Sequence, residues 1–269
     1  MEKNVLVELI DVSKVYKFKK VLNKINFKIH SGERIALLGG NGSGKSTLVE
    51  IIGKIREKTS GEIKYNPNLR VGFQFQESKY PNSITVKMVI DFYKDTFPDS
   101  SANSISDEHI QNLLKLFRLE VYLNKRISKL SGGEQQRLNI LLALINSPNF
   151  LILDELSTGL DIKIKREVME YITNYLNLNP ECALILITHN PPEVKKMCNK
   201  LIILDNGNFV ENREISTIEK EENLNLDEYL ENVFNKLYKK DDKVYQIPDK
   251  MKYSSKSLFS KIFKKKGGK

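Results

Sequence analysis

The sequence predicts an α/β fold with a mixed, largely parallel sheet at its core. Two runs that are apolar at every position, 150–153 and 183–187, are separated by a segment of helical periodicity, and a third run at 201–204 follows a short helical segment. Strands without polar alternation are typical of a parallel sheet that helices cover on both faces. A glycine-rich stretch at 39–44 lies between a predicted buried strand at 34–38 and a helical segment, which is the order of a strand, a phosphate-binding loop and a helix.

Two further regions surround this core. Short alternating segments at 5–10 and 25–29, with two more strands expected within 61–76, predict an antiparallel β subdomain at the N-terminus. From 84 to 130 the pattern becomes helical, which predicts an inserted helical subdomain. The other expected elements are a helix from about 45, helices over about 132–146 and 161–178, a short helix after Pro191-Pro192, a hairpin turn at Asn206-Gly207, and helical structure over 213–240.

The composition is that of a folded globular protein. The chain has 269 residues, of which 40% are hydrophobic and 29% are charged. No apolar run approaches the ~20 residues that a membrane-spanning helix needs, and no secretory signal is visible, so we expect any membrane-spanning part in another chain. Cys182 and Cys198 have no partner motif and are expected to be reduced and buried.

The net charge of +9 lies in the C-terminal segment. Residues 236–269 contain twelve Lys and three Asp, whereas basic and acidic residues balance in the rest of the chain. Only eight of the 43 basic residues are Arg, the type that reads bases best, so no sequence-specific binding of nucleic acid is expected. Leu258, Phe259, Ile262 and Phe263 fall on one helical stripe among lysines, a pattern typical either of a segment that binds an anionic membrane or of a solvated tail.

The glycine-rich loop carries the first chemical motif. Its sequence Gly-Gly-Asn-Gly-Ser-Gly-Lys-Ser-Thr matches G-x-x-x-x-G-K-[ST] in full. Glycines let successive backbone N–H groups face a polyphosphate, and the next helix directs its positive end at the same anion. Lys45 is expected to contact the β- and γ-phosphates, and Ser46 to offer its hydroxyl oxygen to Mg²⁺. The loop residues predicted to bind ATP are Gly39, Gly40, Asn41, Gly42, Ser43, Gly44, Lys45, Ser46 and Thr47.

Two acidic residues follow the apolar run 150–153. This strand delivers Asp154 and Glu155 at its carboxyl end, where open α/β sheets bind ligands. Asp154 is expected to hold Mg²⁺, directly or through water, and Glu155 to polarise the attacking water as general base. The two motifs together predict a polyphosphate and Mg²⁺ as ligands.

A third motif lies between these two. Residues 130–137 read Leu-Ser-Gly-Gly-Glu-Gln-Gln-Arg and are similar to the signature sequence of ATP-binding cassette (ABC) ATPases, which other P-loop NTPases lack. The resemblance covers about 4–212, with all motifs in the family order, and implies an ABC-type P-loop NTPase fold and ATP hydrolysis. We therefore expect an ABC ATPase domain over 1–235 and a basic tail over 236–269.

The resemblance assigns further residues by position. Tyr16 resembles the aromatic residue that stacks on adenine, and Asp161 the acid that links the two halves of a dimer. Gln76 resembles the Gln that contacts Mg²⁺ and the attacking water, with Gln74 as a rival. His189 resembles the switch histidine that contacts the γ-phosphate. The implied catalytic set is Lys45, Gln76, Glu155 and His189, and the implied metal set is Ser46, Gln76 and Asp154. Gly40 and Leu156 stand where the family often has Pro, but no chemical group is lost.

The family arrangement implies partners. Two cassettes face head to tail, and each ATP lies between the phosphate loop of one and the signature of the other. Ser131, Gly132, Gly133 and Glu134 are thus expected at the nucleotide of a second chain, which is either a copy or a related cassette; the Ser131 hydroxyl and the helix N-terminus would be donors for the γ-phosphate. An integral membrane permease is the other expected partner, which places the protein in the cytoplasm, on the cytoplasmic face of the cell membrane.

Segment 74–86 resembles the ATPases of bacterial multidrug or antibiotic exporters, so export is the expected direction. A soluble ABC ATPase that powers no transport, such as the iron–sulfur cluster assembly ATPase, is the alternative, because it is similar in size and also a single cassette. A non-hydrolysing, ATP-gated scaffold is a third class, and the presence of Glu155 and His189 disfavours it.

Overall fold

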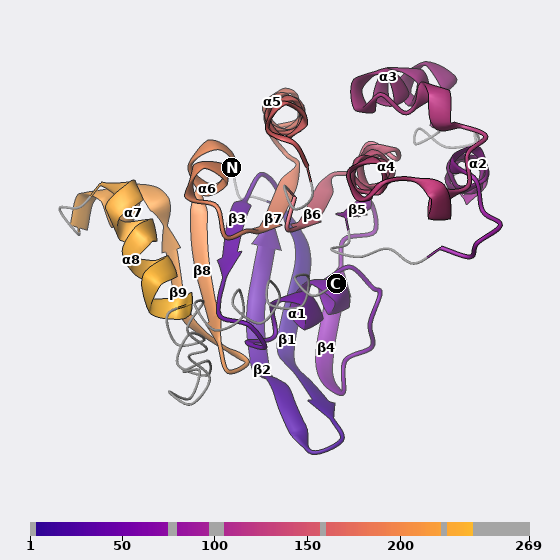
Figure 1. Cartoon of the computed structure of the whole chain (residues 1–269). Coiled ribbons are helices and arrows are strands. Elements are labelled where there is room, and N and C mark those ends of the chain that lie inside the picture. The colour runs from indigo at the N-terminus through magenta and orange to yellow at the C-terminus, as the bar shows by residue number, and fades with distance from the viewer. Residues whose placement is uncertain (1–3, 75–79, 97–104, 157–159, 222–224, 239–269) are drawn as a thin grey trace, which may run out of the picture.

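Two β-sheets and the helices around them make up the computed structural model of this chain (Figure 1). The structure describes residues 4–74, 80–96, 105–156, 160–221 and 225–238. The strands are β1 (Val5–Tyr16), β2 (Lys19–His30), β3 (Arg34–Leu38), β4 (Ser60–Tyr65), β5 (Val71–Gln74), β6 (Phe150–Asp154), β7 (Ala183–Ile187), β8 (Lys200–Asp205) and β9 (Asn208–Glu214). The helices are α1 (Lys45–Ile52), α2 (Val86–Thr96), α3 (Asp107–Phe117), α4 (Gly132–Leu144), α5 (Ile162–Leu178), α6 (Pro191–Met197), α7 (Ile215–Glu221) and α8 (Leu226–Tyr238), with short 3₁₀ turns η1 (Glu120–Tyr122) and η2 (Ile127–Lys129).

The larger sheet has the strand order β5-β6-β7-β3-β8-β9. Neighbours from β5 to β8 are parallel, and β9 pairs antiparallel with β8. The smaller sheet has the order β2-β1-β4 and is antiparallel throughout. Both the mixed, largely parallel core and the N-terminal antiparallel subdomain are confirmed.

The strands of the core are buried on both faces, as their unbroken apolar runs predict. Every residue of β6 and β7 is buried. Successive side chains of a strand point to opposite faces, so Leu151 and Leu153 pack with α4 and α5, while Phe150 and Ile152 pack with α1 and the smaller sheet. This two-sided packing fixes where β6 ends, and with it the position of the acidic residues that follow.

The inserted region is helical, as its pattern predicts. Helices α2 and α3 pack against α4 through buried side chains such as Val86, Leu113 and Phe117 (Figure 1). Ser106 caps α3 by accepting a hydrogen bond from the His109 N–H group at 3.1 Å. Among the described residues, no helix combines the length and apolar character that crossing a bilayer requires.

The first two strands are longer than predicted. Both run for twelve residues: β1 continues past the expected end at residue 10, and β2 begins at residue 19 rather than at 25. The β1–β2 pairing shifts register at several points, and Asp11 and Lys24 have positive φ angles of 49° and 45°. Such bulges interrupt the alternation of polar and apolar residues that sequence analysis relies on.

The helical structure expected over 213–240 is present as two helices, α7 and α8, of which the first begins at Ile215. The expected turn at Asn206-Gly207 is present, with φ angles of 46° and 74°, and it leads into the edge strand β9 rather than directly into a helix. No side chain of β9 is fully buried, because only one neighbour covers it. Two separate helices then follow, of which α8 ends at Tyr238.

Candidate nucleotide-binding site

The glycine-rich loop connects β3 to α1 and depends on residues without a side chain. Gly39 has a φ of 155°, and a Cβ atom there would lie 2.2 Å from the Leu204 carbonyl oxygen. Gly44, which precedes the first residue of α1, has a φ of 110°. Only glycine adopts these conformations without strain, so the loop keeps its backbone open at the positive end of α1.

Lys45 folds back over this loop. Its ammonium group donates hydrogen bonds to the carbonyl oxygens of Gly39, at 2.6 Å, and Gly40, at 3.1 Å. The charge is therefore held within the loop rather than in solvent. A polyphosphate placed in the loop would meet this charge together with the N-terminal amides of α1.

Asp154 lies at the end of β6 and is 6% exposed. Burial raises the pKa of its carboxyl group to about 6; the negative charge of Glu155 adds to the effect, while a hydrogen bond with Ser46 and the charge of Lys45 oppose it. A divalent cation between Asp154 and Ser46 would favour the ionised carboxylate. Among the described residues, no group of three or more His, Cys, Asp or Glu side chains could hold a metal ion.

Glu155 and His189 meet across neighbouring strands. Glu155 follows β6 with a φ of 56°, and its N–H group donates to the Ile187 carbonyl oxygen at 3.0 Å. The register of β6 and β7 places Asp154 opposite Ile187, so the next residues of both strands leave the sheet at one edge. There His189 Nε2 lies 3.3 Å from Glu155 Oε1.

A cavity of about 300 Å³ brings most of these groups together. It is lined by Lys19, Val21, Asn41, Gly42, Gly44, Lys45, Ser46, Thr47, Asp154, Glu155, Ile187 and His189. Gly39 and Gly40 do not line it but hold Lys45. Ser43, which belongs to the loop, is buried, and among the described residues its hydroxyl oxygen has no hydrogen-bond partner. Lys19 is a cation of the cavity that the sequence did not predict, because a single Lys at the start of a strand belongs to no motif for phosphate binding.

Tyr16 lies beside this cavity rather than in its lining. It is paired with Lys19 in the β1–β2 ladder and is 37% exposed. Two cations flank its ring: Lys14 Nζ lies 5.1 Å and Arg56 Cζ 5.5 Å from the centroid. A ring at this place is available for stacking, and its role with adenine stays a prediction.

The signature residues form a second surface. Ser131 caps α4: its hydroxyl accepts from the Glu134 N–H group at 3.3 Å, and the Glu134 carboxylate accepts from the Ser131 N–H group at 2.8 Å. That contact lowers the pKa of Glu134 to about 2, with further help from Tyr122 and Lys125. A Cβ atom on Gly132 would meet nothing within 4 Å. Described residues 131–134 take no part in lining the cavity.

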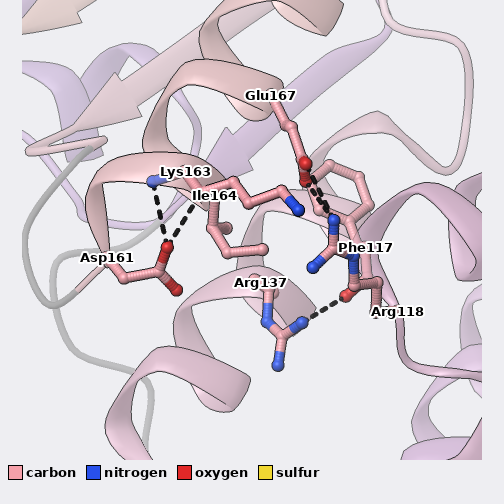
Figure 2. A network of polar contacts seen from close by, with 7 residues as sticks. All are labelled: Phe117, Arg118, Arg137, Asp161, Lys163, Ile164 and Glu167. Carbon is pink, nitrogen blue, oxygen red and sulfur yellow. Dashed lines mark hydrogen bonds and ion pairs between the residues drawn. The ribbon is translucent and has the colours of Figure 1, made fainter.

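Asp161 is a helix cap in this structure. Its carboxylate accepts from the N–H groups of Lys163 and Ile164, each at 3.0 Å, and so begins α5 (Figure 2). Nearby, Arg118 at the end of α3 forms two hydrogen bonds to Glu167 of α5, at 2.7 and 3.0 Å. The predicted contact of Asp161 with a second chain stays a prediction.

Gln76 lies outside the described residues. Gln74, the other candidate for its role, is fully buried at the end of β5.

Comparison with known proteins identifies the class. The model of the ABC transporter family matches residues 22–158. The zinc import ATP-binding protein ZnuC of Pasteurella multocida is 34% identical over 203 residues, which cover 74% of this chain and 73% of the relative. The spermidine/putrescine import ATP-binding protein PotA of Mycoplasma mycoides is 30% identical over 215 residues, 77% of this chain but 60% of the relative. The chain belongs to the ABC transporter family.

Solved structures agree with this assignment. A structure described as the ATP-binding subunit of an ABC transporter has a TM-score of 0.74 and 25% identity, covering 86% of this chain and 99% of the other. The ATP-binding cassette MJ0796, in a dimeric post-hydrolysis state bound to ADP and Pi, has a TM-score of 0.65 and 26% identity, covering 78% and 98%. The fold is thus that of ABC ATPases, and the chain is an ATP-binding subunit of the class that couples ATP hydrolysis to transport. The relatives named above are import proteins, so the expectation of an exporter gains no support.

Proposed function

We propose that this chain binds Mg²⁺ and ATP at the cavity beside the phosphate loop, and that ATP hydrolysis there drives transport through a separate membrane subunit. The observation that carries the proposal is the convergence on one cavity of a cation, a hydroxyl, two carboxylates and an imidazole from three elements that are distant in sequence. Those side chains are Lys45, Ser46, Asp154, Glu155 and His189.

Each group has a chemical task that its position supports. The loop amides and Lys45 hold the phosphates, and Ser46 with Asp154 holds Mg²⁺, to which Gln76 is proposed to add a contact. The bound cation would supply positive charge to the phosphate oxygens. Glu155 is the general base that accepts a proton from the attacking water. His189 Nε2 is 3.3 Å from Glu155 Oε1, which is close enough to orient that carboxylate, and His189 is also proposed to donate to the γ-phosphate.

The second half of the site is proposed to come from another cassette. Ser131 and Gly132 are exposed at the N-terminus of α4, where the helix offers free amides and a positive end. These donors do not line the cavity of their own chain, so they suit the γ-phosphate bound by a partner. The dimeric state of MJ0796, 26% identical to this chain, supports this arrangement. All the catalytic groups are in one chain, so a homodimer would have two active sites.

The membrane partner sets the cargo and the direction. The names of the curated relatives favour import, and segment 74–86, part of which lies outside the described residues, is the basis of the predicted export. No observation favours the alternative of a soluble iron–sulfur assembly ATPase. We place the chain on the cytoplasmic face of the membrane, where it docks to its permease.

Two measurements test the proposal. The first is phosphate release by the purified chain with ATP, with and without Mg²⁺, beside nucleotide titration. Hydrolysis that requires Mg²⁺ is expected; a well-folded chain without affinity for adenine nucleotides would refute the site. The second is capture from solubilised membranes with tagged chain, where co-purification of a polytopic membrane protein is expected. Its absence, with ATPase activity intact, would favour the soluble alternative.

The basic tail is tested separately, because residues 239–269 lie outside the described residues. Liposomes with anionic lipids should co-sediment with the full chain and less with a chain truncated after Asp249, if the tail adds membrane affinity. Equal binding of both forms would show that it does not.

A further inference from the structure

A buried carboxylate lies under the loop that carries His189. Glu193, in the first turn of α6, is 0% exposed, and none of the sequence motifs includes it. A charged side chain is rarely buried so completely unless other groups pair with it. Its partners therefore indicate what it does.

Both neighbours of His189 bind this carboxylate. The Thr188 hydroxyl donates to Glu193 Oε2, and the Asn190 side-chain amide donates to Oε1 at 3.1 Å. The Thr188 hydroxyl oxygen also accepts from the Asn190 N–H group at 3.1 Å. The backbone on each side of His189 is thus fixed to one anchor, while the His189 side chain is 40% exposed toward the cavity.

A lysine from another helix completes the anchor. Lys165 Nζ lies 3.3 Å from Glu193 Oε1, which compensates the buried negative charge. Lys165 is in the first turn of α5, and its N–H group donates to the Asp161 carbonyl oxygen at 2.9 Å. A continuous series of contacts therefore runs from the start of α5 through Glu193 to His189 and on to Glu155.

We propose that Glu193 is a positioning residue that, with Lys165, holds His189 where it can reach Glu155 and the γ-phosphate. The inference rests on the role that the proposed function gives His189. It goes further, because it makes the start of α5, which Asp161 caps, a mechanical support of the histidine. A displaced imidazole costs rate even when every reacting group is present.

The test is a double-mutant cycle with Glu193→Gln and His189→Ala. Glu193→Gln keeps the side-chain size but removes the charge that pairs with Lys165. We expect kcat for ATP hydrolysis to fall about tenfold while KM changes less than about twofold, as expected when an interaction specific to the transition state is weakened. In the His189→Ala background, the same substitution should lower kcat less than about twofold, because the histidine through which it acts is gone.

A matched control separates positioning from stability. Glu33 is also buried, at 8% exposure, and pairs with Lys200 at 2.9 Å, but it lies at the opposite end of β3 from the phosphate loop. Glu33→Gln should lower the melting temperature and leave kcat unchanged. Should Glu193→Gln fail to fold, Thr188→Val tests the same anchor by removing one hydroxyl, and it should shift kcat in the same direction.

The outcomes are distinct. Unchanged kcat in a folded Glu193→Gln or Thr188→Val variant, or an equal loss in the presence and absence of His189, would overturn the inference and leave the proposed function standing. Unchanged turnover in His189→Ala alone would refute the role of His189 in the proposed function, and the inference with it.

Discussion

The two halves of the proposed nucleotide site differ in how far one chain completes them. At the phosphate-loop half, Lys45 is held by two carbonyl oxygens, Asp154 binds Ser46, and Glu155 lies beside His189. At the signature half, the Ser131 hydroxyl accepts a hydrogen bond from the Glu134 N–H group as a helix cap, and Ser131 is exposed. A Cβ atom on Gly132 would meet nothing within 4 Å.

The difference follows from what supports each half. The phosphate-loop half lies at the carboxyl ends of parallel strands whose core positions are buried on both faces, so its groups converge within one chain. The signature half is a single helix terminus on the surface. We therefore propose that the phosphate-loop half binds nucleotide by itself and that the signature half acts only on a nucleotide bound by a second chain. Four predictions test this division, from the largest expected effect to the smallest.

Glu155→Gln should abolish turnover without abolishing binding. General-base catalysis contributes roughly 10²–10⁴-fold, so kcat should fall by at least about 10²-fold while ATP still binds. With hydrolysis stopped, ATP and Mg²⁺ should accumulate a dimer, visible by size-exclusion chromatography. The exposed Glu57→Gln is the control and should behave as wild type. A persistent monomer with normal turnover would contradict the role of Glu155.

Ser131→Asp should damage the signature half alone. Asp caps helices as well as Ser, so the melting temperature should change little, but a second negative charge facing the γ-phosphate costs several kcal/mol. We expect turnover to fall by about 10²-fold with nucleotide affinity of the monomer unchanged. Ser106→Asp, at the N-terminal cap of α3, is the matched control because Ser106 also caps a helix but belongs to no motif. A loss of monomer affinity would place the signature in its own chain's site.

Lys45→Ala should weaken nucleotide binding by the monomer. Hydrogen bonds to charged groups contribute about 1.5–3 kcal/mol, so affinity should fall roughly 10- to 100-fold in a fluorescence titration with ATP. Lys54→Ala, outside the loop, controls for charge. Equal affinities in wild type and Lys45→Ala would count against the loop.

Mg²⁺ affinity should depend on pH through Asp154. Its raised pKa of about 6 means that protons compete with the cation below this pH. The ionised fraction rises from about a tenth at pH 5 to about nine tenths at pH 7, so affinity for Mg²⁺ with bound ADP should rise about tenfold by calorimetry. Asp154→Asn should retain only the smaller dependence that the nucleotide phosphates contribute. An equal pH dependence in both proteins would exclude Asp154 as a ligand.

The sequence predicted which residues meet at the cavity better than it predicted the edges of the fold. The loop at Lys45 and the acids at Asp154 and Glu155 were identified from motifs that follow apolar runs, and His189 was identified from the resemblance to ABC ATPases. The cavity contains all four. The hairpin turn at Asn206-Gly207 was predicted, but the extent of the edge strand β9 after it was not, because none of its residues is buried. The long hairpin of β1 and β2 was underestimated because bulges break its alternation.

The sequence by itself determined which residue types stand at the ends of buried strands and at helix N-termini. Unbroken apolar runs predict buried strands, and glycines indicate where the backbone takes conformations that other residues disfavour. Only the tertiary structure decided which of those ends adjoin. The parallel pairing of β6 with β7 places Glu155 beside His189, and the packing of α5 against α6 brings Lys165 to the buried Glu193. Such contacts join residues that are distant in the chain. The distances between these side chains depend on tertiary packing, which local sequence patterns do not predict.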